Sequence, residues 1–217
     1  MGAIHLIRHG QASWGADDYD ELSELGARQS ALLGMAWEAS DWAPTTAVSG
    51  SLKRHTQTAI AAIDASGQDG AMGGGYDVDD GWNEYDHRFL VEAVDARGTV
   101  TPREFQPFLD ASLASWMEGD LAHSGVSYGD WRGSVVGSLE RALAAAGSGQ
   151  HVAVFTSGGP IATVVSHLLA GDDSLFIRLN AVVVNASVTT IINGSTGPRV
   201  LSFNEHTHLP RDLVTFR

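Results

Sequence analysis

An arginine and a histidine stand side by side near the amino terminus, where a short apolar run ends at a glycine. The run is residues 4–7, and Arg8, His9 and Gly10 follow it. A histidine can attack phosphorus through one ring nitrogen when a nearby carbonyl holds the proton on the other nitrogen. An adjacent arginine can bind phosphoryl oxygens with its planar guanidinium group. The pair therefore suggests phosphoryl transfer, with a structural histidine bonded to its turn as the alternative.

A second group of residues suited to binding phosphate lies in residues 49–59. Arg54 stands near the predicted start of a helix, where unpaired backbone N–H groups carry partial positive charge. A guanidinium group at that position favours a dianionic phosphate. The alternative is that Lys53 and Arg54 form a solvated basic pair.

The elements that must position these residues alternate between strand and helix at the start of the chain, which predicts an α/β fold. We expect Ser23 to cap the first helix, and the last two strands to form a hairpin at the sheet edge. Because ligands of open α/β sheets bind at the carboxyl ends of the strands, His9 and Arg54 are in suitable positions. The predicted strands are 3–8, 45–49, 151–156, 186–193 and 199–204, and the predicted helices are about 22–39, 52–65, 133–146 and 160–170.

The middle of the chain shows the weakest patterns. Residues 66–81 are rich in glycine and acidic side chains and indicate an exposed loop. Residues 82–131 indicate a helical excursion over the sheet, similar to a lid, because prolines and glycine interrupt helical patterns there. No linker isolates this segment, so we expect a single domain over residues 1–217.

Composition narrows the classes of function. The 217 residues carry 26 acidic against 13 basic side chains, a formal net charge of −13, which argues against nucleic acid or an anionic membrane as a partner. Cysteine is absent, which excludes disulfides, thiolate zinc sites and cysteine nucleophiles. Since no signal peptide or membrane-spanning run is visible, we expect a cytoplasmic protein.

Several motifs in order resemble the histidine phosphatase superfamily, which includes cofactor-dependent phosphoglycerate mutase. The resemblance extends over nearly the whole chain and implies a mixed, mainly parallel sheet with helices on both faces, in a three-layer sandwich. The motifs are Leu6-Ile7-Arg8-His9-Gly10-Gln11, Leu22-Ser23-Glu24-Leu25-Gly26, Leu52-Lys53-Arg54-His55-Thr56-Gln57-Thr58-Ala59, Glu84 after an aromatic segment, Phe155-Thr156-Ser157-Gly158-Gly159, and residues 204–209.

The resemblance implies that His9 is a nucleophile that becomes phosphohistidine, with Arg8 and Arg54 holding the phosphoryl group. Glu84 matches the general acid and base of the family. Such a transition state spreads charge over three oxygens, and the leaving oxygen needs a proton, so cations and one carboxylic acid suffice. We therefore expect no metal and no cofactor. Gln11 and Ser13 are further candidate donors to the phosphate or substrate.

One motif departs from the family. Most members have a second histidine just before the glycine pair, where this chain has Ser157. Loss of one such donor lowers a rate by roughly 10² to 10³ fold. The Ser157 hydroxyl and the backbone at Gly158 are candidates for an anion-binding turn in its place. We also hypothesise that His87 supplies the missing donor, with a surface histidine as the alternative.

The favoured function is hydrolysis of a small phosphomonoester. A mutase is less favoured, because Glu84 is not followed by the mutase sequence Arg-His-Tyr-Gly. The alternative of another class is a catalytically impaired protein that binds phosphoesters. We interpret His55 and His167 as structural helix residues, and the exposed last strand leaves a homodimer possible.

Overall fold

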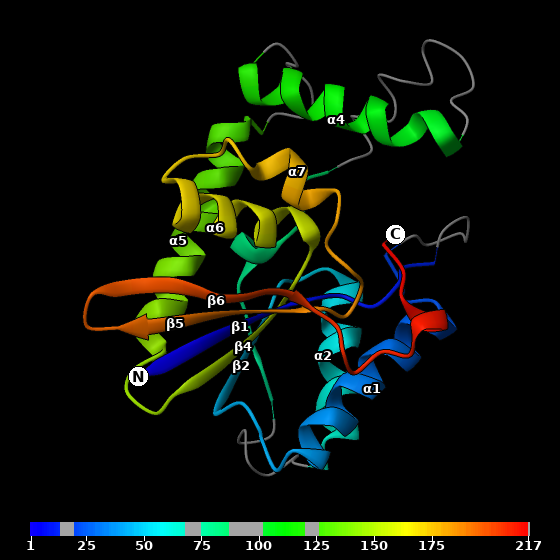
Figure 1. Ribbon diagram of the computed structural model, residues 1–217, viewed down its shortest axis with the longest axis vertical. Coiled ribbons are helices and arrows are strands. Elements are labelled where there is room, and N and C mark those ends of the chain that lie inside the picture. The colour runs from blue at the N-terminus through cyan, green and yellow to red at the C-terminus, as the bar shows by residue number, and fades with distance from the viewer. Residues whose placement is uncertain (14–19, 68–74, 87–101, 120–125, 217) are drawn as a thin grey trace.

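The sheet has six strands in the order β3-β2-β4-β1-β5-β6 (Figure 1). The computed structural model describes residues 1–13, 20–67, 75–86, 102–119 and 126–216. Strands β1 to β4 run parallel, and β5 and β6 run antiparallel to their neighbours, which confirms the expected mixed, mainly parallel α/β sheet. The strands are β1 (Gly2–Arg8), β2 (Thr46–Ser49), β3 (Asp77–Val78), β4 (His151–Thr156), β5 (Val188–Gly194) and β6 (Gly197–Glu205).

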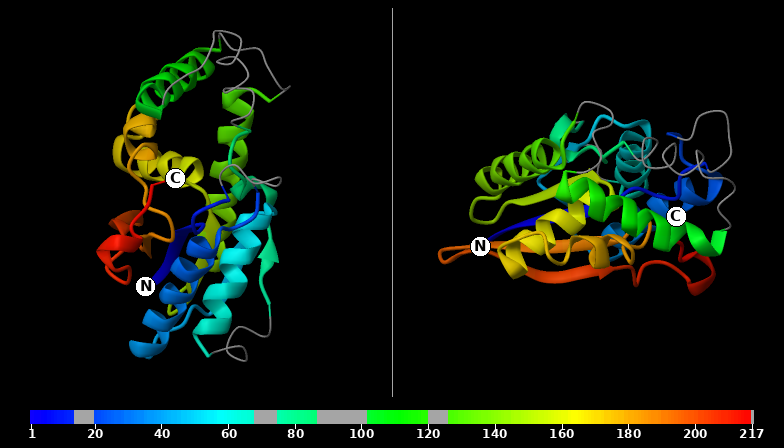
Figure 2. Two further views of the ribbon diagram at one scale, coloured as in Figure 1. Left: turned by 90° about the vertical axis from the view of Figure 1, so that its right-hand side faces the viewer. Right: turned by 90° about the horizontal axis from the view of Figure 1, so that it is seen from above.

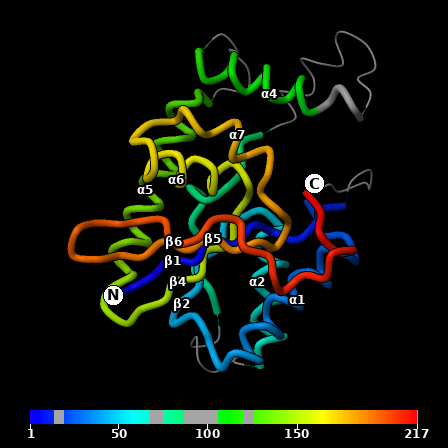
Figure 3. Tube along the Cα trace, in the orientation of Figure 1, coloured from blue at the N-terminus to red at the C-terminus, as the bar shows by residue number. Residues whose placement is uncertain are grey.

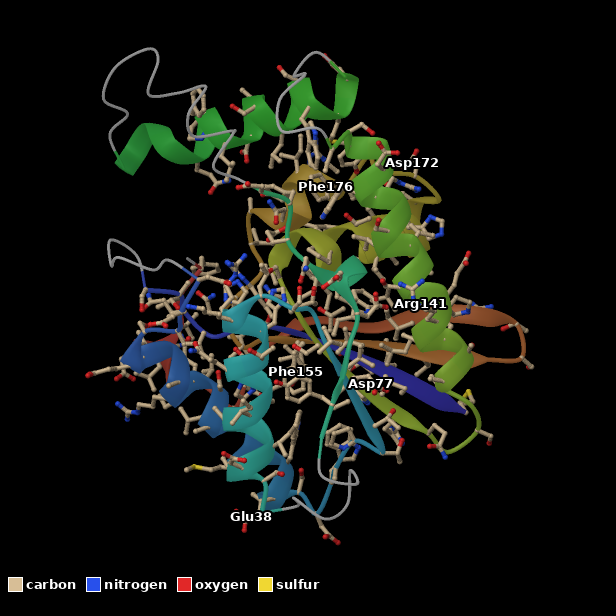
Figure 4. The ribbon with its side chains drawn as sticks, turned by 180° about the vertical axis from the view of Figure 1, so that it is seen from behind. Glu38, Asp77, Arg141, Phe155, Asp172 and Phe176 are labelled. Carbon is tan, nitrogen blue, oxygen red and sulfur yellow. The ribbon has the colours of Figure 1, made fainter. Side chains whose placement is uncertain are left out.

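Helices cover both faces of the sheet, because successive strand residues point to opposite sides. Ile7 and Phe155 pack on α1 (Glu24–Ala39) and α2 (Lys53–Ala65), and Figure 4 labels Phe155 beside α2. Leu6 of β1 and Val154 of β4 face the other way, in a second core cluster with α5 (Tyr128–Ala145) and α6 (Gly158–Ala170). The three layers confirm the expected architecture.

The carboxyl ends of β2, β4 and β1 lie next to one another. Arg8 is opposite Thr156, and Ser49 is opposite Phe155. The residues that follow these strands therefore emerge at one edge of the sheet. This alignment brings the three predicted motifs together, although about 150 residues of sequence separate the first from the last.

The start of the first helix and the hairpin at the sheet edge agree with the predictions from the sequence. Ser23 caps α1, with its hydroxyl accepting a hydrogen bond from the Gly26 N–H at 3.1 Å. Strands β5 and β6 form the expected hairpin, and β3 and β6 are the opposite edges of the sheet (Figure 2). After β6 the chain contains the short 3-10 helix η2 (Arg211–Leu213) and returns to α1, where Gln29 Nε2 donates to Leu213 O (Figure 3).

The expectation of a loop over residues 66–81 is wrong at its end. Strand β3 pairs with β2 there, and the 3-10 helix η1 (Asp80–Trp82) follows it. Two exposed strand residues are too few to produce an alternating pattern, so no sequence signal was available.

The expected helical excursion at 82–131 includes α4 (Pro102–Glu118) and the first turn of α5. In Figure 1, α4 lies at the top of the molecule, next to α7 (Phe176–Asn180) and farthest from the sheet. Leu113 and Trp116 of α4 join the core cluster of α5 and α6.

Two predicted helices begin too late, and α7 was not predicted. Helix α5 begins at Tyr128 because the Ser127 hydroxyl accepts from the Asp130 N–H, a cap that the glycines in this segment obscure. Helix α6 begins at Gly158, before the proline taken as its start. No helix in the described ranges has the length and apolar character needed to cross a bilayer.

Candidate active site

His9 follows β1 and lies in the interior, with 6% of its surface exposed. Its Nδ1 is 2.6 Å from the carbonyl oxygen of Gly10, so Nδ1–H donates to that oxygen and Nε2 carries the lone pair. The backbone around the ring is also held, because the His9 N–H donates to Thr156 O and the Ala186 N–H donates to His9 O. The imidazole therefore has a defined tautomer and a fixed position.

Two arginines, Arg8 and Arg54, lie close enough to the His9 ring for their charges to act on it. Arg8 donates to the carbonyl oxygens of Val183 and Phe216, and its guanidinium group lies against Gly158 at the start of α6. Arg54, in the first turn of α2, is only 6% exposed and forms an ion pair with Asp20 at 2.7 Å. These contacts orient both guanidinium groups before any anion binds.

The charges of the arginines act on His9. Burial, with further contributions from Arg54 and Arg8, lowers the pKa of His9 well below its ordinary value. The ring is therefore neutral at physiological pH, and its Nε2 is available as a nucleophile.

Glu84 reaches the site from the segment that follows η1. The ends of two strands hold this segment, since Thr156 Oγ1 donates to Trp82 O at 2.6 Å and the Ser51 N–H donates to Asn83 Oδ1 at 2.8 Å. From the other side, Trp131 of α5 donates its indole N–H to Asn83 O at 3.1 Å. Glu84 is thus positioned by packing between the sheet and α5.

The carboxyl group of Glu84 lies at the start of α6. Its Oε2 accepts a hydrogen bond from the Gly159 N–H at 3.2 Å, while its buried Oε1 has no hydrogen-bond partner among the described residues. Burial raises the pKa of Glu84, although Arg54 and the Gly159 N–H act in the opposite direction. Burial thus favours the protonated form of the carboxyl group, which is the form that can deliver a proton.

The remaining predicted phosphate-binding residues lie in different parts of the fold. The Gln11 side-chain oxygen accepts from the Ser23 hydroxyl at 3.0 Å, which ties it to the start of α1. Ser157 is fully buried at the end of β4, and Gly158 begins α6 directly after it. His87 lies outside the described residues, so its predicted contact with the phosphate stays a prediction.

His55 was interpreted as a structural helix residue, and the structure places it beside the other motifs. Its Nε2 is 2.6 Å from Ser157 Oγ, and its ring centroid is 5.7 Å from that of His9. The signal available in the sequence was its position directly after Arg54, but only the pairing of the strand ends shows that residues 55 and 157 meet.

Comparisons with known proteins agree with this geometry. The model of the histidine phosphatase superfamily (branch 1) matches residues 4–206. No curated protein matches the sequence at a significant level.

Solved structures share the fold at low sequence identity. Phosphoserine phosphatase of Entamoeba histolytica in complex with 3-phosphoglyceric acid superposes with a TM-score of 0.67 at 20% identity, over 97% of this chain and 100% of that one. The mycobacterial glucosyl-3-phosphoglycerate phosphatase gives 0.64 at 21% identity, over 94% and 99%. Phosphoglycerate mutase of Bacillus anthracis gives 0.63 at 19% identity, over 95% and 94%. With the family model matched from the first strand to the end of the last, the chain belongs to branch 1 of the histidine phosphatase superfamily.

Proposed function

We propose that the protein hydrolyses a small phosphomonoester through a phosphohistidine intermediate on His9, with Glu84 as general acid and base. The observation that carries this proposal is the tautomer of His9. Its Nδ1 is held by Gly10 O, and its pKa is lowered, so Nε2 is a neutral nucleophile beside two arginines. A structural histidine bonded to its turn does not need two arginines next to it, one of them buried.

The reaction has two halves. In the first, His9 Nε2 attacks phosphorus, the bond from phosphorus to the leaving oxygen breaks, and that oxygen takes the proton of Glu84. In the second, water attacks the phosphohistidine, Glu84 takes a proton from the water, the phosphorus–nitrogen bond breaks, and inorganic phosphate leaves. Arg8 and Arg54 stabilise the charge on the three equatorial oxygens throughout.

The raised pKa of Glu84 supports its place in both halves. A protonated carboxyl group can donate in the first half, and the same group, then ionised, can accept in the second. Its uncompensated Oε1 is the atom suited to this exchange, because Oε2 is already bonded to the Gly159 N–H.

A rapid-quench experiment with a labelled phosphomonoester tests the proposal. We expect an acid-labile phosphoprotein that forms and decays at the rate of turnover in the wild type, and no labelling in His9→Ala. Tight binding of phosphate without labelling or turnover would instead support the impaired, phosphoester-binding protein. Transfer of the label to a second hydroxyl group rather than to water would support a mutase.

A further inference from the structure

The contact between His55 and Ser157 joins two residues that the family resemblance treats separately. Ser157 stands where most members of the family have their second histidine, and His55 stands one residue after the phosphate-binding arginine. Both side chains are fully buried, and Nε2 of the ring is 2.6 Å from the hydroxyl oxygen. The imidazole missing from position 157 is thus present in the same region, attached to α2 instead of β4.

Space for this ring is provided by the backbone that faces it. A Cβ atom at Gly50 would lie 2.4 Å from His55 Nδ1 and 2.7 Å from Asn83 Oδ1, closer than side-chain atoms come. Glycine directly after β2 therefore lets the imidazole come close to the backbone. No atom of the described residues forms a hydrogen bond with His55 Nδ1.

The absence of a partner for His55 Nδ1 among the described residues determines which atom donates in the hydrogen bond between His55 and Ser157. A buried N–H without an acceptor is disfavoured more than a buried lone pair without a donor. The proton of the neutral ring therefore belongs on Nε2, where it donates to Ser157 Oγ. Burial and the charge of Arg54 lower the pKa of His55 well below its ordinary value, which keeps the ring neutral.

With its oxygen occupied as an acceptor, the Ser157 hydroxyl has one proton left to donate. It does not cap α6, since no side-chain cap bond is formed there. The ring that holds it is the direct neighbour of the His9 imidazole. The hydroxyl proton is therefore available for an anion attached to His9.

We propose that His55 and Ser157 together replace the second histidine of the family: Ser157 donates its hydroxyl proton to a phosphoryl oxygen, and His55 is the positioning residue that holds the hydroxyl. This inference rests on the proposed phosphatase function. It makes Ser157 a catalytic donor rather than a sign of lost activity.

Steady-state hydrolysis of p-nitrophenyl phosphate by single and double variants tests the pair. We expect Ser157→Ala to lower kcat by about 10² fold, as expected for one donor to the transition state. His55→Ala should lower kcat at least about 10-fold with a smaller change in KM, because the donor acts mainly in the transition state. The double variant should be no slower than Ser157→Ala, since residues that act as a unit are not additive.

Two rescue variants separate positioning from simple packing. In His55→Gln the amide N–H can still donate to Ser157, so kcat should stay within about threefold of wild type. Exchanging the positions in His55→Ala/Ser157→His restores the arrangement of the family and should be faster than His55→Ala alone. Ser157→His with His55 retained should lose both activity and stability, because no space exists for two rings at 2.6 Å.

His167→Ala is the matched control, because it removes an imidazole from the last turn of α6. It should keep the wild-type kcat. Thermal unfolding of each variant shows whether it is folded, and the rescue pair carries the test if His55→Ala is not. An active wild type with unchanged kcat in His55→Ala would overturn the inference alone. A wild type that neither forms phosphohistidine nor turns over would overturn the proposed function, and the inference with it.

Discussion

Substitution of Gly159 by alanine should disable the general acid while leaving the nucleophile intact. A Cβ atom at this position would lie 2.1 Å from Glu84 Oε1 and 2.8 Å from the ring of Tyr85. Ordinary contacts begin at 3.4 Å, so the carboxyl group has to move by roughly 1 Å or more. That shift also breaks the 3.2 Å hydrogen bond from the Gly159 N–H to Oε2.

The expected magnitude follows from this displacement. A misplacement of about 1 Å at a reacting group can lower a rate by roughly 10² fold, so we expect kcat of Gly159→Ala to fall by about that factor. The phosphorylation of His9 by an alkyl phosphate should slow most, because an alkoxide leaves only with a proton. Single-turnover labelling with an alkyl phosphate measures this step directly.

Gly133→Ala is the matched control. Among the described residues, no atom outside the nearby backbone of α5 lies within 4 Å of a Cβ at Gly133, and alanine there should stabilise the helix by up to about 1 kcal/mol without changing kcat. The reasoning is refuted if folded Gly159→Ala, verified by circular dichroism, keeps kcat within about threefold of wild type.

Three further predictions concern the general acid Glu84, the histidine His5 and the contact between α1 and α2. Glu84→Gln should lower the rate of alkyl phosphate hydrolysis by about 10² to 10⁴ fold, and it should let phosphohistidine accumulate from p-nitrophenyl phosphate; unchanged turnover in steady-state assays would contradict the role of Glu84. Burial and His151 lower the pKa of His5 to about 4, so the unfolded chain binds more protons between about pH 6.5 and pH 4, and stability falls as pH falls. Between pH 7 and pH 5, the free energy of unfolding measured in urea should fall less in His5→Gln than in the wild type, and the two decreases should differ by at most about 2 kcal/mol. Equal decreases in the two proteins would show that His5 does not contribute to this pH dependence. Gly34→Ala should destabilise by about 1 to 3 kcal/mol, because its Cβ would lie 2.1 Å from Ala62 O across the α1–α2 contact; a midpoint of urea unfolding equal to wild type would exclude that close approach.

The sequence determined the main elements and the residues from which the candidate site is built. Strong apolar patterns predicted the strands at both ends of the chain, and Ser23 marked the start of α1 correctly. Motifs at strand ends pointed to one edge of the sheet, since that relation follows from parallel pairing alone. Strand β3 and helix α7 were missed, because two and five residues are too short to show a period.

Only the tertiary structure decided how these residues act on one another. The buried position of Glu84 against α6, with its Oε2 bonded to the Gly159 N–H 75 positions away, depends on how the chain returns to the sheet. His55 shows the difference most clearly: on its own helix it is one polar residue among several, and its meaning depends on Ser157, 102 positions away. Local sequence carries helix and strand preferences, but the pairing of two buried polar groups arises when β2 and β4 align in register. The serine at position 157 is therefore a departure from the family in sequence, while its partner His55 is visible only in the folded chain.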